Sequence, residues 1–183
     1  MKEMIYFYKK LCTLYKRLFW SKERQARSVG VTLGNNNFID SRFWSSEPYL
    51  ITIGNNCQIT SGVKFFTHGG GQVIRDKLPD FDSFGKIVIG DFVYLGTNVL
   101  VLPGVTIGDN VLVAAGSVVT KSIPSNCVVA GNPVKFICSI DEYLEKNLKY
   151  NTRTKGLDYS SKKEFLEKAD DSIFISKPIL KNR

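Results

Sequence analysis

The chain has 183 residues, of which 43% are hydrophobic and 23% charged, with a formal net charge of +8 and one histidine. This composition is that of a globular domain with one continuous core, and it excludes a membrane-spanning protein because no apolar run reaches the roughly 18 residues needed. The start of the chain lacks the apolar h-region of a secretory signal, so we expect a cytoplasmic protein.

The N-terminal segment, residues 1–28, is basic. Residues 1–27 hold eight Lys or Arg and two acidic residues, which accounts for +6 of the net charge. Apolar residues recur there at the spacing of an amphipathic helix: Ile5, Tyr8, Cys12, Tyr15 and Phe19. We expect this helix to pack its aromatic face on the base of the following domain. The alternative is a weak association with an anionic membrane surface, at the inner face of the membrane. No nucleic-acid-binding motif accompanies the charge, so no nucleic-acid partner is expected.

A six-residue repeat dominates residues 89–124. Each of six consecutive hexads begins with an aliphatic residue: Ile89, Leu95, Val101, Ile107, Val113 and Val119. The fifth place holds a small or β-branched residue: Val93, Val99, Val105, Val111, Ser117 and Ile123. This period fits neither a 3.6-residue helix nor a hairpin meander. It is typical of a parallel β-helix in which the first and fifth positions face one apolar core.

The same period extends upstream with less regularity. Hexads begin at Leu33, Ile39, Ile53, Ile59 and Phe65, with fifth positions at Asn37, Phe43, Cys57 and Val63. The next leading residue after Phe65 is Ile89, so 18 extra residues interrupt the repeat. We expect an excursion loop at 69–86, inside a β-helix domain that covers 29–137.

The only histidine, His68, stands at the end of a regular hexad, directly before the excursion. Imidazole titrates near neutral pH and is therefore suited to take a proton from a hydroxyl as that hydroxyl attacks an electrophile. A zinc site built from three histidines is excluded, and no metal is expected. His68 is the candidate general base.

The four cysteines, Cys12, Cys57, Cys127 and Cys138, lack the spacing of a zinc site. Cys57 falls on a core position, so it is expected to be a buried thiol in a reducing compartment. Neither Cys57 nor Cys127 has a neighbouring base in sequence, which argues against a nucleophilic role.

The repeat ends at 127–135, and the remaining segment, 138–183, predicts a helical cap and tail. One helix is expected from Ile140 to Leu148, capped by Ser139 or Asp141, and a second at 161–169. We expect these helices to cover the exposed strand edges of the last coil.

Four segments resemble the hexapeptide-repeat acyltransferases, and among them the maltose, galactoside and capsular-polysaccharide sugar O-acetyltransferases. They are Thr67-His68, Leu-Pro-Gly-Val-Thr-Ile-Gly at 102–108, Ala-Gly-Ser-Val-Val-Thr-Lys at 115–121 and Val-Val-Ala-Gly-Asn-Pro at 128–133. The resemblance spans about residues 29–137. It implies an all-β solenoid, a left-handed parallel β-helix of hexapeptide repeats, with an N-terminal amphipathic helix, one long excursion loop and C-terminal helices.

The resemblance also implies acetyl-CoA as co-substrate, bound in a groove between the subunits of a homotrimer. Small corner residues would let the pantetheine approach the backbone, and basic residues would meet the phosphates by charge-assisted contacts. The expected acetyl-CoA-binding residues are Gly96, Ala114, Ala115, Thr120, Lys121 and Lys135. The coil itself also requires small residues at its corners.

One departure from the family pattern concerns the partner of the imidazole. Where relatives tend to carry Asp directly after the histidine, this chain has Gly69. The orienting group would then be Glu47, Asp76, Asp80, Asp82 or a backbone carbonyl. Glu47 is the second catalytic candidate because it lies in an irregular patch about one coil from His68.

The acceptor is expected to be a saccharide. Two kinds of residue are candidate contacts for it: aromatic residues, which can stack on sugar rings, and polar residues of the excursion. They are Trp44, Tyr49, Arg75, Asp76 and Asp82. Packing of the two aromatic rings against the excursion loop is the competing interpretation.

Together these features predict an acetyltransferase that moves acetyl from acetyl-CoA to a sugar hydroxyl, in surface polysaccharide biosynthesis, by direct transfer with His68 as base. Two alternatives stay open. One is an N-acetyltransferase acting on an amino sugar nucleotide, and the other is a non-catalytic β-helix that serves as an assembly or binding module.

Overall fold

The computed structural model describes residues 2–179, so Met1 and residues 180–183, the ends of the two predicted terminal segments, lie outside the described part. The chain forms two compact units that divide between Ile140 and Asp141. Each unit is described by itself.

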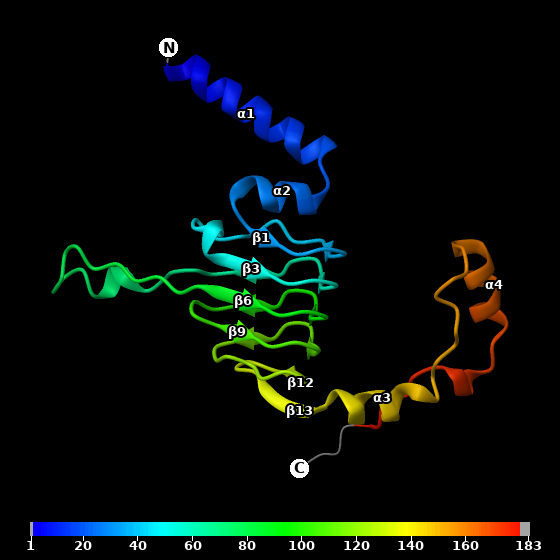
Figure 1. Cartoon of the computed structure of the whole chain (residues 1–183). Helices are drawn as coiled ribbons and strands as arrows, with labels where there is room; N and C mark the ends of the chain where they lie inside the picture. The colour runs from blue at the N-terminus through cyan, green and yellow to red at the C-terminus, as the bar shows by residue number, and fades with distance from the viewer. Residues whose placement is uncertain (1, 180–183) are drawn as a thin grey trace. The chain divides into compact units, whose positions relative to one another are not determined.

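In the first unit the chain visits three sheets in turn and then returns to the first (Figure 1). The first sheet contains β1 (Thr32–Leu33), β3 (Ile51–Ile53), β6 (Ile87–Ile89) and β9 (Thr106–Ile107). The second contains β2 (Phe38–Ile39), β4 (Gln58–Ile59), β7 (Tyr94–Leu95), β10 (Val111–Val113), β12 (Cys127–Ala130) and β13 (Lys135–Ser139). The third contains β5 (Lys64–Phe65), β8 (Leu100–Val101) and β11 (Val118–Val119).

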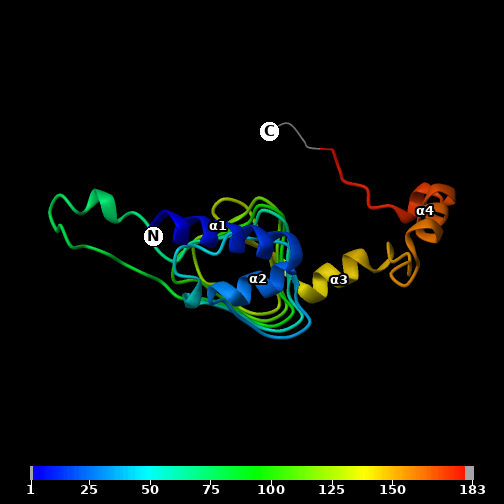
Figure 2. The same cartoon turned by 90° about the horizontal axis from the view of Figure 1, so that it is seen from above.

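The strand register shows how the hexads stack. Tyr94 pairs with Leu112, and Leu100 pairs with Val118, both in parallel. Each pairing joins residues three hexads apart, so three hexads complete one coil. Figure 2, the view from above, shows the coils lying over one another. This is the stacking of a parallel β-helix.

The buried residues confirm the predicted core of the repeat. The leading residues from Ile89 to Val119 are at most 1% exposed, and the fifth-position residues from Val93 to Ile123 at most 5%. Upstream, the leading residues Ile53, Ile59 and Phe65 and the fifth-position residues Cys57 and Val63 are at most 2% exposed.

Two upstream fifth positions depart from the pattern, because Asn37 is only partly buried and Phe43 is exposed. The prediction that Phe43 faces the core is wrong, because its side chain is 44% exposed and Trp44 is buried instead. The Trp44 ring stacks on Phe65 at 5.2 Å between ring centroids. Ser45 has a φ of 62°, in the left-handed region, so the backbone turns out of the hexad pattern directly after Trp44.

The corner between the first and second sheets explains the Gly-Asp/Asn pairs of the repeat. The side chains of this corner form a ladder in which each accepts a hydrogen bond from the backbone N–H one coil away. The bonds run from Asn35 N to Asn55 Oδ1, from Asn55 N to Asp91 Oδ1, from Asp91 N to Asp109 Oδ1, and from Asp109 N to Ser125 Oγ. The polar corner residues therefore connect successive coils.

The N-terminal segment forms two helices rather than one. They are α1 (Lys2–Phe19) and α2 (Lys22–Val29), and Ser21 caps α2 by accepting a hydrogen bond from Arg24 N at 3.2 Å. α2 packs on the first coil and buries Ala26 completely. The apolar side chains of α1 stay exposed, for example Tyr15 at 57% and Phe19 at 71%. The prediction that this aromatic face packs on the base of the coils is therefore wrong. The side chain of Ile5 lies outside the described part.

The repeat ends in a strand that the sequence analysis did not predict. β13 runs antiparallel to β12 and so covers the outer edge of the second sheet. Unpaired strand edges attract further strands, and a reversed strand is one way to cover such an edge.

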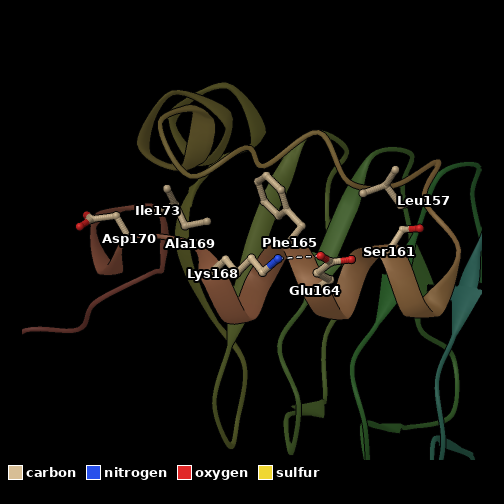
Figure 3. Close-up of a pocket in the computed structure, with 8 residues that line it drawn as sticks. All are labelled: Leu157, Ser161, Glu164, Phe165, Lys168, Ala169, Asp170 and Ile173. Atoms are coloured by element: carbon tan, nitrogen blue, oxygen red, sulfur yellow. Dashed lines mark hydrogen bonds and ion pairs between the residues drawn. The ribbon is translucent and has the colours of Figure 1, made fainter.

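The second unit contains α3 (Ile140–Leu148), α4 (Tyr159–Lys168) and the short 3-10 helix η3 (Asp171–Ile173). The two predicted helices are thus present, and Asp158 caps α4 by accepting from Ser161 N at 3.0 Å. A hollow of about 610 Å³ lies between α4 and η3, and Figure 3 shows Leu157, Phe165 and Ile173 around it, beside the Lys168–Glu164 ion pair. Neither His68 nor Glu47 is among its lining residues. That the helices cover the last coil stays a prediction.

Candidate active site

His68 lies where the third sheet ends and the chain leaves the coil. β5 ends at Phe65, Thr67 is fully buried, and the excursion begins after His68. The excursion closes on itself at its base, because His68 forms an antiparallel bridge with Phe84 and Gly85 N donates to Thr67 O at 2.7 Å. Figures 1 and 2 show the resulting arm running away from the coils. His68 therefore stands at the root of the arm, at the edge of the coil.

Glu47 is the residue that holds the imidazole. Its Oε2 lies 2.7 Å from His68 Nδ1, and the same oxygen accepts a hydrogen bond from the Thr67 hydroxyl at 2.6 Å. Glu47 directly precedes the short 3-10 helix η1 (Pro48–Leu50), one coil before His68. Position 69 is Gly, and the carboxylate that contacts the imidazole comes from Glu47, 21 residues before His68 in the chain.

Thr67 fixes the other side of this arrangement. Its hydroxyl lies 2.8 Å from Ser45 Oγ, and its backbone N–H donates to the same Ser45 oxygen at 3.2 Å. Ser45 is positioned by the left-handed backbone conformation described above. The irregular patch around Trp44 thus places two side chains, Ser45 and Glu47, against the Thr67-His68 pair.

The electrostatics of the pair follow from these bonds. The hydrogen bond from the Thr67 hydroxyl, and next the hydrogen bond from His68, hold the pKa of the Glu47 carboxyl below its ordinary value. A carboxylate at Nδ1 favours the tautomer with the proton on that nitrogen and leaves Nε2 with a free lone pair. The side chain of His68 is 39% exposed, whereas that of Glu47 is 16% exposed. The imidazole can therefore reach a ligand while its partner is shielded.

A cavity of about 410 Å³ opens beside His68. It is lined by Arg42, Phe43, Trp44, Ser45, Ser46, Phe66 and His68. Hydroxyl groups, aromatic carbon and one guanidinium surround it, which is a set suited to a polar ligand with hydroxyl groups. Arg42 and Phe66 were missed by the sequence analysis, although both directly neighbour residues that it singled out.

Of the five predicted acceptor-binding residues, only Trp44 lines this cavity. Trp44 is 7% exposed and its ring stacks on Phe65 of β5, so it packs in the core and not against the loop, as the competing interpretation had it. Tyr49 is 67% exposed and stands outside the lining.

The excursion residues Arg75, Asp76 and Asp82 lie out on the arm. Arg75 lies 3.8 Å from Asp82 and donates from Nε to Phe81 O, so these two predicted acceptor contacts pair with each other. Asp76 is exposed. Within one chain the arm brings none of the three to the cavity beside His68.

The residues predicted to bind acetyl-CoA divide between two corners. Gly96, Ala114 and Ala115 lie where the chain passes from the second sheet to the third. A Cβ on Gly96 would lie 2.5 Å from the backbone nitrogen of Ala115, so the packing of successive coils already requires glycine there. Ala115 is exposed and Ala114 partly so.

Thr120 and Lys121 lie at the other corner, which also carries His68. Both are exposed and follow β11, which stacks under β8 and β5. They are therefore two coils from His68, about 10 Å along the stack at the usual strand spacing. Lys135 is exposed on β13.

Cys57 and Cys127 offer no alternative nucleophile. Cys57 and Cys127 are buried, and burial is the main cause that raises the pKa of each thiol. A thiol with a raised pKa stays protonated and unreactive at neutral pH.

Comparisons with known proteins agree with this architecture. Residues 86–121 match the family described as bacterial transferase hexapeptide (six repeats). The Staphylococcus aureus protein CapG is 51% identical over 148 residues, which cover 79% of this chain and 86% of CapG. The galactoside O-acetyltransferase of Escherichia coli K12 is 38% identical over 114 residues, covering 61% of this chain and 55% of that protein.

A solved structure extends the likeness to three dimensions. The hexapeptide-repeat-containing acetyltransferase of Vibrio cholerae O1 biovar eltor, complexed with acetyl coenzyme A, aligns with a TM-score of 0.51 at 25% identity. The alignment covers 69% of this chain and 81% of that chain. On the repeat, the stacked parallel coils and the extent of the match to CapG, the chain belongs to the hexapeptide-repeat acyltransferase family.

Proposed function

We propose that this protein transfers an acetyl group from acetyl-CoA to a hydroxyl of a sugar, with His68 as general base. The observation that carries the proposal is the 2.7 Å contact between Glu47 Oε2 and His68 Nδ1 at the edge of a cavity with hydroxyl and aromatic lining. The galactoside O-acetyltransferase and the acetyl-CoA complex among the similar proteins support the same chemistry.

In this proposal His68 Nε2 takes the proton of the sugar hydroxyl while the hydroxyl oxygen attacks the thioester carbonyl carbon. The carbon–sulfur bond then breaks, and the proton passes from the imidazolium to the departing sulfur, which leaves as the free thiol of coenzyme A. Glu47 keeps the imidazole in the useful tautomer and stabilises its charged form. Transfer is direct and needs no covalent intermediate on the protein.

The two-corner arrangement supports a site shared between subunits. His68, Thr120 and Lys121 occupy one corner, and Gly96, Ala114 and Ala115 occupy another. In a homotrimer the corner of one subunit meets the face of the next, so a groove between subunits lets both sets contact one acetyl-CoA. The arm, with Arg75, Asp76 and Asp82 exposed on it, would then complete the acceptor site of a neighbouring subunit.

The finer assignments belong to the same proposal. They are a left-handed coil, the three segments 1–28, 29–137 and 138–183, a cytoplasmic location, and an acceptor in surface polysaccharide or its precursor. The left-handed coil and the acceptor rest on the resemblance to sugar O-acetyltransferases given above. The segment bounds rest on the extent of the hexad repeat, and the location rests on the expectation of reduced, buried thiols. Arg42, exposed at the cavity, is added as an acceptor contact.

The test is an assay of thiol release from acetyl-CoA over a panel of sugars, amino sugar nucleotides and serine, with mass spectrometry of the products. We expect saccharide-dependent release and an O-acetyl ester that mild base removes. An amide product on an amino sugar nucleotide would replace O-transfer by N-transfer. Absence of acetyl-CoA binding and of turnover with every acceptor would overturn the proposal in favour of a non-catalytic module.

A further inference from the structure

Helix α1 presents one continuous apolar face. Nine described side chains share it at three- and four-residue spacing: Met4, Phe7, Tyr8, Leu11, Cys12, Leu14, Tyr15, Leu18 and Phe19. At about 100° per residue these positions cover roughly half of the helix circumference without a charged residue among them.

This face has no cover in the protein as described. Its large side chains are between 49% exposed, for Leu11, and 71% exposed, for Met4 and Phe19. α2 differs, because it packs on the first coil and buries Ala26. A contiguous exposed apolar surface of this kind marks an interaction site in a water-soluble domain.

The charge on α1 indicates the partner. Lys10, Lys16 and Arg17 lie beside the apolar face, and no Asp or Glu occurs between Met4 and Ser21. Lys10 and Arg17 share one side with Tyr6 and Thr13, around a hollow of about 400 Å³. Lys16 lies on the other side, 5.0 Å from the centre of the Trp20 ring. Cations on both flanks of an apolar face can extend to the phosphates of lipid headgroups while the face enters the acyl region.

The width of the apolar face indicates whether its partner is a membrane or a second copy of the chain. A two-stranded coiled coil uses two of every seven positions for its seam. Here four of the seven positions from Leu11 to Arg17 are apolar, namely Leu11, Cys12, Leu14 and Tyr15. Tyrosine, moreover, is enriched where a membrane meets water. A face this broad fits a flat surface better than a narrow seam.

We propose that α1 lies in the plane of an anionic lipid bilayer, with its apolar face in the membrane and its cations among the headgroups. Among residues 2–179 no helix is long and apolar enough to span the bilayer, so α1 rests on the surface. This binding is a property of α1 and does not depend on the proposed acetyl transfer.

The experiment measures co-sedimentation of the full-length protein with vesicles, either phosphatidylcholine alone or phosphatidylcholine with about one third phosphatidylglycerol. We expect binding to the anionic vesicles, weaker binding to the neutral ones, and a decrease with added salt. The double variant Leu11→Gln/Leu18→Gln keeps charge and helix propensity, and should bind at least about tenfold more weakly because two apolar side chains are lost from the face. Tyr6→Gln, on the polar side, is the matched control and should bind like the wild type.

The electrostatic part is tested by Lys10→Gln/Lys16→Gln/Arg17→Gln, which should weaken binding to anionic vesicles by about 100-fold and leave the neutral ones nearly unchanged. His68→Ala should bind as the wild type does, so a failure of the proposed catalysis would not disturb this result. Equal binding to both vesicles, or an unaffected Leu11→Gln/Leu18→Gln, overturns the proposal. The proposal is also overturned if the wild type does not bind vesicles and light scattering shows that the double variant changes the oligomeric state. The apolar face would then contact a second copy of the chain.

Discussion

Two corners of the same coil use their polar residues in different ways. At the corner between the first and second sheets, the side chains of Asn55, Asp91 and Asp109 accept hydrogen bonds from the backbone of the adjacent coil. At the corner that follows the third sheet, Glu47 accepts instead from Thr67 and holds His68. At the first corner the polar groups form hydrogen bonds between stacked coils, whereas at the second corner Nε2 of His68 stays available to a ligand. Changes at the second corner should therefore affect turnover, and changes at the first should affect stability.

The largest effect is expected from His68→Ala. Removing a general base lowers kcat by about 10² to 10⁴-fold. The side chain is 39% exposed, so its loss opens no core cavity and the unfolding midpoint should stay close to that of the wild type. Steady-state thiol release and urea unfolding measure the two quantities. Turnover near the wild-type rate would remove His68 from the mechanism.

Glu47→Gln should lower kcat by about 10 to 10³-fold, less than the roughly 10⁴-fold found when the orienting carboxylate of a protease triad becomes an amide. The amide keeps the shape of the side chain but cannot stabilise the imidazolium. KM for the acceptor should change little, and this distinguishes an orienting role from binding. Asp91→Asn, the same substitution at the other corner, is the control and should leave kcat unchanged.

The pH dependence of stability gives Glu47 a second readout. Its pKa is lower in the folded protein than in the unfolded chain, mainly through the Thr67 hydroxyl. The ionised Glu47 carboxylate therefore stabilises the folded protein fully at any pH above its pKa in the unfolded chain. This stabilisation is lost as the pH falls through the lower pKa of the folded protein. The difference in unfolding free energy between the wild type and Glu47→Gln should stay constant near neutrality and disappear in acid. A difference that persists at the lowest pH would contradict the assignment.

A medium effect is expected from Asp91→Ala at the stacking corner. The backbone N–H and the side-chain amide of Asn55 both donate to Asp91 Oδ1, at 2.7 Å and 3.1 Å. Loss of this acceptor should lower the free energy of unfolding by about 1–3 kcal/mol, while kcat per folded molecule stays the same. Asp91→Asn keeps the acceptor oxygen and should cost much less. If both variants lose equal stability, the hydrogen bond is not the cause.

The smallest expected effect is a gain in stability, from Phe92→Asn. Phe92 has a φ of 56° at a corner position where other coils place Asn36, Asn56, Asn110 and Asn126 at similar angles. A bulky residue in the left-handed region costs about 1–2 kcal/mol, whereas Asn tolerates it. Phe92→Asn should therefore raise the free energy of unfolding by about 1 kcal/mol. Phe92→Ala keeps the unfavourable Cβ and should gain little, and equal gains from both would point to the lost aromatic ring instead.

Much of the coil could be predicted from the sequence because the hexad period is local. The leading residues from Ile89 to Val119 were identified as core from their spacing alone, and the structure buries them. The interruption at His68 was equally visible as a break in the period. The prediction that Phe43 faces the core was wrong because the hexad pattern ends there. Whether Phe43 or Trp44 is buried depends on which ring can stack on Phe65 one coil away.

The site shows the same division. The repeat, its apolar positions and the single histidine at the break can all be identified from residue spacing. The sequence left five possible partners for that histidine, and it predicted one N-terminal helix with a packed aromatic face where the structure has α1 and α2. The contact between Glu47 and His68 and the exposed apolar face of α1 became visible only in the folded chain. The reason is that hydrophobic period and turn chemistry are read within a few residues, whereas a contact between residues 21 apart depends on how one coil stacks on the next.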